Sequence, residues 1–79
     1  MNYKIRTFGI VSDILGAKEV VLDIQGKTVA DLRQHLARNY PALKELNSLF
    51  IAVNHQYADD QTPLTEIDEI AIIPPVSGG

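Results

Sequence analysis

The residues most suggestive of chemistry stand at the carboxyl end of the sequence. Two prolines, two small residues and two glycines follow the apolar run Ile70–Ile73. Proline has no backbone N–H and holds φ at roughly −65°, so a strand through this run should stop and continue as an extended tail. Glycine has no Cβ, so the last residues can enter a channel too narrow for any side chain. The sequence therefore predicts a slim tail ending in a free carboxylate, made of Pro74, Pro75, Val76, Ser77, Gly78 and Gly79.

Other arrangements that could carry chemistry are weak. The chain has no cysteine, which excludes disulfides, thiolate metal sites and a cysteine nucleophile. His35 and His55 lack the spacing of a paired metal-ligand set. Acidic runs at 59–60 and 66–69 could serve as acid–base pairs, but acidic residues are common in turns and at strand edges. We therefore expect no metal site and no side-chain acid–base centre.

The composition is that of a small globular protein that binds neither nucleic acid nor membrane. A length of 79 residues suits one domain, residues 1–79, with 74–79 as its extended C-terminal tail. The net charge of −3, without a basic patch interleaved with aromatics, argues against nucleic-acid binding. The longest apolar runs are too short to cross a bilayer, and the first residues lack the apolar core of a signal peptide. A cytoplasmic location is the expectation.

Hydrophobic periodicity predicts extended segments on both sides of one main helix. Alternating apolar and polar residues, bounded by turn residues, indicate strands at 3–8, 18–24, 49–53 and 69–73, with a short edge segment at 56–58. A short helical turn is expected at Ile10–Leu15, with Gly16 as its C-cap. The segment 64–67 is expected to return to the core.

The main helix has recognisable start and stop signals. Thr28 is an N-cap candidate, with Asp31 at the capping-box position three residues later. Because Pro41 disfavours the helical conformation in the residue before it, the regular helix should end near Asn39. Apolar residues at spacings of three and four form one stripe that faces a core. The stripe consists of Val29, Leu32, Leu36, Tyr40 and Leu43.

This order of elements indicates a two-layer α+β domain, because an amphipathic helix between strand pairs needs one face of a sheet to cover. Alternation then places a second set of residues on the opposite, open face of the sheet. An exposed aromatic and an exposed isoleucine beside a reaching tail suggest a docking surface, although nearby loops could equally cover Phe8. The candidate docking residues are Phe8, Phe50, Ala71 and Ile73.

Nearly the whole chain also resembles the small subunit of molybdopterin synthase, a family of ubiquitin-like sulfur carriers. The resemblance rests on Ala52-Val53-Asn54, Pro63-Leu64-Thr65 and Asp68-Glu69, and above all on the terminal Pro-Pro-Val-Ser-Gly-Gly motif. The chain departs from the family at Ile72-Ile73, where members often carry aromatics, and at Asn54-His55, where they often carry Asn-Gly. The resemblance implies a β-grasp fold, in which a mixed sheet of four to five strands has its first and last strands parallel at the centre.

For this family the implied function is sulfur transfer during molybdenum cofactor biosynthesis. An E1-like adenylyltransferase would use ATP and Mg²⁺ to form an acyl-adenylate on Gly79, and a sulfur donor protein would displace AMP to leave a thiocarboxylate. The tail would then enter the large synthase subunit, in an assembly of two large and two small subunits, where its sulfur attacks the pterin precursor. The chain would bind no cofactor itself. It would supply the sulfur, while its partners supply the catalytic side chains and the nucleotide site.

Two other functions stay open at the level of sequence. A sulfur carrier for thiazole biosynthesis shares the diglycine end but less of the Pro-Pro-Val approach. A β-grasp interaction module or protein-conjugating modifier would use the same terminus to form an isopeptide bond with lysines. The three functions differ in the partner that receives the tail.

Overall fold

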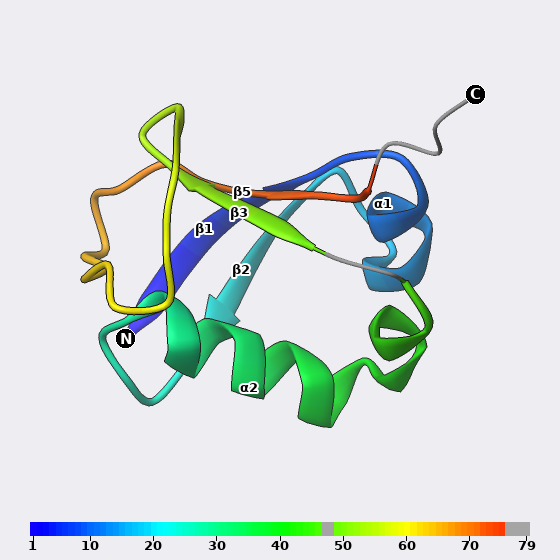
Figure 1. Cartoon of the computed structure of the whole chain (residues 1–79), viewed down its shortest axis with the longest axis horizontal. Coiled ribbons are helices and arrows are strands. Elements are labelled where there is room, and N and C mark those ends of the chain that lie inside the picture. Colours follow the sequence, from blue (N-terminus) through cyan, green and yellow to red (C-terminus); the bar gives the residue numbers. More distant parts are fainter. Residues whose placement is uncertain (47–48, 76–79) are drawn as a thin grey trace.

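The computed structural model describes residues 1–46 and 49–75. A five-stranded sheet forms one layer, and the helix α2 packs against it as the second layer (Figure 1). The elements follow the order expected from the sequence. They are β1 (Asn2–Thr7), α1 (Ile10–Leu15), β2 (Glu19–Asp23), α2 (Val29–Asn39), the 3₁₀ helix η1 (Pro41–Glu45), β3 (Phe50–Val53), β4 (Gln56–Tyr57) and β5 (Ile70–Ile73).

The sheet has the strand order β2-β1-β5-β3-β4, which puts the first and last strands side by side at its centre (Figure 1). β1 and β5 run parallel, with Ile5 opposite Ile70 and Thr7 opposite Ile72. The other neighbouring strands in the sheet are antiparallel. This is the β-grasp arrangement, so the predicted α+β fold with a mixed sheet and one main helix on one face is confirmed.

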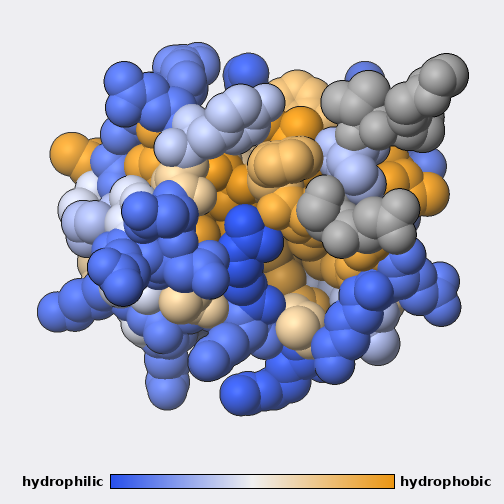
Figure 2. Space-filling view, in the orientation of Figure 1, coloured by the Kyte–Doolittle hydropathy of each residue, from blue (hydrophilic) through white to orange (hydrophobic). Residues whose placement is uncertain are grey.

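Alternation along the strands separates a buried face of the sheet from an open face. In β1, Tyr3, Ile5 and Thr7 are buried while the residues between them are exposed. In β5, Ile70 and Ile72 are buried and the residues after them are partly exposed. The buried face and the inner side of α2 share one hydrophobic core. The outer side of α2 is hydrophilic, as the lower edge of Figure 2 shows.

The main helix begins and ends where the sequence predicts. Thr28 is the N-cap: its Oγ1 accepts a hydrogen bond from the Asp31 N–H at 3.4 Å, and Asp31 Oδ2 accepts one from the Thr28 N–H at 3.2 Å. This reciprocal pair is a capping box, which satisfies N–H groups near the helix start that lack helical partners. At the other end, Tyr40 caps the helix and Pro41 starts η1, which turns Leu43 into the core.

Two expectations need correction. β1 ends at Thr7, so Phe8 lies at the start of the following turn rather than in the strand. The segment expected to return to the core does so only at its first residue: Leu64 is buried, but Ile67 is 93% exposed. The Asp68 N–H donates to the Thr65 carbonyl at 3.1 Å, and this turn directs Ile67 outward.

Candidate docking face and tail

β5 leads directly into the predicted tail. The strand ends at Ile73, and Pro74 and Pro75 follow as partly exposed residues outside the sheet, as the two prolines predict. The loop after β1 lies against the base of the tail, because a Cβ built on Gly9 would come within 3.3 Å of Pro74 Cγ. The remaining predicted tail residues lie outside the described residues, so their role stays a prediction. They are Val76, Ser77, Gly78 and Gly79.

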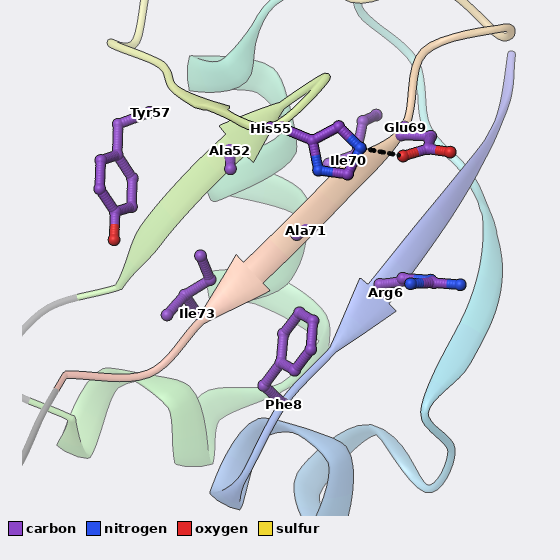
Figure 3. A pocket seen from close by; sticks show the side chains of 9 residues that line it. All are labelled: Arg6, Phe8, Ala52, His55, Tyr57, Glu69, Ile70, Ala71 and Ile73. Atoms are coloured by element: carbon purple, nitrogen blue, oxygen red, sulfur yellow. Dashed lines mark ion pairs between the residues drawn. The ribbon is translucent and has the colours of Figure 1, made fainter.

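The open face of the sheet carries the four predicted docking residues. Phe8 and Phe50 are 46% and 44% exposed, while Ala71 and Ile73 are partly buried. Phe50 pairs with Ile73 across β3 and β5, and the parallel course of β1 and β5 brings Phe8 beside Ile73 (Figure 3). Within residues 1–46 and 49–75, no loop covers Phe8. The sheet is therefore apolar and accessible next to the base of the tail.

Part of the open face is hollowed. A hollow of about 400 Å³ opens over β1, β3 and β5, and Figure 3 looks into it. Of the four predicted docking residues, Phe8, Ala71 and Ile73 line the hollow, whereas Phe50 lies outside its lining. Sequence reasoning did not anticipate the other lining residues, which are Arg6, Ala52, His55, Tyr57, Glu69 and Ile70.

Among these unanticipated residues, Tyr57 is the exposed large hydrophobic one. It lies in β4 opposite Ala52 and is 74% exposed. Its ring centroid lies 5.6 Å from that of Phe50, with an interplanar angle of 53°, so the two rings form a tilted aromatic pair. A strand of two residues gives almost no alternation signal. The available signal was the hairpin, since a two-residue turn at Asn54-His55 puts Ala52 and Tyr57 on the same face.

Polar side chains border the hollow at the turn between β3 and β4. His55 Nε2 lies 2.9 Å from Glu69 Oε2, with both side chains exposed (Figure 3). Asn54 Nδ2 donates to Asp68 Oδ1 at 2.9 Å, and Asn54 Oδ1 accepts from the Glu69 N–H at 3.0 Å. The bond from Asn54, followed by one from the Thr65 N–H, holds the pKa of Asp68 below its usual range. Two sequence motifs, one ending at Asn54 and the other starting at Asp68, thus meet in space.

Acidic side chains of the described part of the chain take part in local hydrogen bonds and ion pairs. Over that part of the chain, no group of three or more histidine and acidic side chains is placed to hold a metal ion, and no helix has the length and apolar character to span a membrane. Several carboxylates instead stabilise local structure. Hydrogen bonds from the Lys27 N–H and from Thr28 hold the pKa of Asp31 below its usual range, and Asp60 pairs with Arg33 at 2.8 Å.

The strand order, the single main helix and the accessible sheet face beside the last strand define a ubiquitin-like β-grasp protein. The chain belongs to the ThiS family, whose model matches residues 5–79. It is 34% identical to the molybdopterin synthase sulfur carrier subunit of Caenorhabditis elegans, over 100% of this chain and 99% of the relative. It is 38% identical to the subunit of the same name from Escherichia coli (strain K12), over 96% and 98%. The predicted family resemblance is confirmed.

Solved structures support the fold. The small archaeal modifier protein 1 from Methanosarcina acetivorans is 30% identical, with a TM-score of 0.79 over 99% of this chain and 96% of that one. A protein–protein complex of subunits 1 and 2 of the molybdopterin-converting factor from Helicobacter pylori 26695 contains a chain that is 28% identical. That chain has a TM-score of 0.68, and all of both chains is covered. The β-grasp body is therefore shared with a modifier protein and with a chain of that complex.

Proposed function

We propose that this chain is the sulfur carrier subunit of molybdopterin synthase and acts in molybdenum cofactor biosynthesis. The observation that carries the proposal is its end-to-end similarity, at 34% and 38% identity, to relatives of that name. The fold supports it physically, because the open apolar face lies beside the point where β5 passes into Pro74 and Pro75. A partner that docks on this face is well placed to receive the tail.

The proposed reactive residue is Gly79. An E1-like adenylyltransferase uses ATP and Mg²⁺ to join the Gly79 carboxylate to AMP, and pyrophosphate leaves. A sulfur donor protein then releases sulfur as hydrosulfide, which attacks the carbonyl carbon; the bond to AMP breaks and AMP leaves, so that sulfur replaces one carboxylate oxygen. The resulting thiocarboxylate attacks the pterin precursor in the large synthase subunit. The chain supplies the sulfur and holds no cofactor, while the catalytic side chains and the nucleotide site belong to the partners.

The tail, residues 74–79, is the part of the single domain 1–79 that the partner receives. Pro74 and Pro75 restrict the backbone before binding, so less conformational entropy is lost when the tail is inserted. Val76 and Ser77 continue the tail, and Gly78 lets the backbone pass a constriction that a Cβ would block. The length and composition of the tail therefore suit a narrow channel in another protein.

Three partners follow from the proposal. The first is the large synthase subunit, and the complex of subunits 1 and 2 from Helicobacter pylori supports this pairing. An assembly of two large and two small subunits is part of the proposal. The second and third are the adenylyltransferase and the sulfur donor protein. A cytoplasmic location is part of the proposal. The docking residues would contact these partners. The exposed aromatic rings among them are of the kind that commonly dominates interface energies. The docking set is Phe8, Phe50, Ala71 and Ile73, with Tyr57 added.

A protein-conjugating modifier is the second candidate, because the solved small archaeal modifier protein 1 has the same fold at 30% identity. A carrier for thiazole biosynthesis is the third. Isothermal titration of the purified chain against the purified large synthase subunit, and separately against a thiazole synthase, distinguishes the two sulfur carriers. Activation of the chain in the presence of other proteins tests for the modifier. Binding to the large subunit alone is the expected result. Binding only to the thiazole synthase, or attachment of the chain to lysines of other proteins on activation, would contradict the proposal.

A further inference from the structure

The turn between β3 and β4 contains the described non-glycine residues that have positive φ. Asn54 has a φ of 53° and His55 a φ of 69°, the combination that a two-residue type I′ hairpin turn requires. Asparagine and histidine both tolerate this conformation better than most residues. The backbone of the turn therefore explains a small residue or an asparagine at position 54, but it does not explain the bonds that the side chain makes.

The Asn54 side chain fastens the turn to the start of β5. Its Nδ2 donates to Asp68 Oδ1 at 2.9 Å and its Oδ1 accepts from the Glu69 N–H at 3.0 Å. The Asn54 N–H adds a backbone bond to the Glu69 carbonyl at 2.7 Å. We call the two side-chain bonds the Asn54 clamp. The partners Asp68 and Glu69 lie 14 and 15 residues after Asn54 in the sequence. The bonds therefore fix the hairpin relative to a central strand of the sheet.

β4 is held by the shortest pairing in the sheet. It has two residues, it lies at the edge of the sheet, and only β3 pairs with it. Its register consists of Ala52 opposite Tyr57 and Val53 opposite Gln56, and one further bond runs from the Ala58 N–H to the Ile51 carbonyl at 2.9 Å. Short edge pairings are the least stable parts of a sheet and open most readily.

The residue that β4 carries onto the open face is Tyr57. The residue is 74% exposed, and its ring centroid lies 5.6 Å from that of Phe50. Few other contacts therefore hold the side chain in place. It lines the hollow together with Phe8 and Ile73, on the opposite side from Phe8 in Figure 3. The position of Tyr57 is therefore set mainly by the backbone of β4.

We propose that Asn54 is a positioning residue for docking: through Asp68 and Glu69 it holds β4 against the sheet and so presents Tyr57 to the partner in its bound position. The inference rests on the proposed function, in which the large synthase subunit docks on the open face. Without the clamp, the hairpin must be ordered when the partner binds. Ordering one mobile side chain and its strand weakens binding by about 3- to 10-fold.

The turn offers a matched pair of variants. Asn54→Gly keeps the positive φ and the backbone bond to Glu69 but removes both side-chain bonds. His55→Gly makes the same kind of change one residue later and removes only the exposed contact with Glu69. Glycine at either position adds the same freedom to the unfolded chain, so the difference between the two variants reports the clamp.

Isothermal titration against the purified large synthase subunit tests the inference. Asn54→Gly should bind about 3- to 10-fold more weakly than wild type. In a Tyr57→Ala background, Asn54→Gly should cause no further loss of affinity, although it still lowers stability. An equal loss in both backgrounds, or no loss in either, overturns the inference. Wild type that fails to bind refutes the docking premise, and the inference falls with it.

A measurement without the partner separates the inference from the proposed function. In the free protein, nuclear Overhauser contacts between the Phe50 and Tyr57 rings should be strong in wild type and in His55→Gly. In Asn54→Gly they should weaken, while contacts between Ile5 and Ile70 in the centre of the sheet persist. Undiminished ring contacts in Asn54→Gly would show that β4 needs no clamp.

Discussion

Ile72 and Ile73 are neighbours in β5 that point to opposite faces of the sheet, so replacing each by alanine separates folding from docking. Ile72 is fully buried in the hydrophobic core, and Ile73 lines the hollow on the open face. Truncating a buried isoleucine to alanine costs about 2–5 kcal/mol of stability. A chain of 79 residues has a total stability on the order of 4–12 kcal/mol, so Ile72→Ala removes a large share of it. Ile72→Val, at about 0.5–1.5 kcal/mol, covers the case in which the alanine variant does not fold.

Ile73→Ala should behave in the opposite way. The side chain is only partly buried, so its truncation should cost about 1 kcal/mol of stability or less. It lies between Phe8 and the aromatic pair at the centre of the apolar face, the position from which interface residues contribute most. Its loss should weaken binding to the large synthase subunit by about 5- to 30-fold.

Urea unfolding followed by circular dichroism measures the first quantity, and isothermal titration with the large subunit measures the second. Titrations are carried out where each variant is folded. The reasoning predicts that Ile72→Val keeps near wild-type affinity and loses stability, whereas Ile73→Ala loses affinity and keeps most of its stability. If Ile73→Ala were as destabilising as Ile72→Ala, or bound as tightly as wild type, the assignment of the two faces would be wrong.

Three further results are expected. Thr28→Ala removes the hydroxyl of the capping box and should lower the free energy of unfolding by about 1 kcal/mol in urea titrations, with β-sheet signals unchanged. Because the folded protein lowers the pKa of Asp31 and of Asp68, their stabilisation is complete above the unfolded value of about 4. Stability should therefore fall as the pH is lowered below about 4, and less steeply in Asn54→Gly. One residue added after Gly79 should abolish thiocarboxylate formation without changing the unfolding curve.

The sequence predicted those parts of the fold whose causes are local. Thr28 and Asp31 signal the helix start within four residues, and Pro41 signals its end. Alternation through β1 and β5 assigns Ile72 to the core and Ile73 to the open face. These signals depend on neighbours in the sequence, which is why the helix bounds and the face assignment could be predicted.

The parts that could not be predicted lack a clear signal in the neighbouring sequence. Nothing near Asn54 shows that its amide will meet Asp68, because that contact exists only once β3 lies beside β5. Tyr57 joins the open face through a strand too short to show alternation. Ile67 looks like a core residue by composition, and only the turn closed by the Asp68 N–H makes it point outward. The sequence therefore leaves hidden the contact of Asn54 with Asp68, the face that Tyr57 joins and the outward position of Ile67.

Intact-mass spectrometry tests the central claim most directly. The purified chain is incubated with its E1-like adenylyltransferase, ATP, Mg²⁺ and a sulfur source, and its mass is compared with that of a sample without ATP. The account predicts a gain equal to the difference between one sulfur and one oxygen atom, located by fragmentation at Gly79. An unchanged mass with an active enzyme, or sulfur found on any other residue, would contradict it.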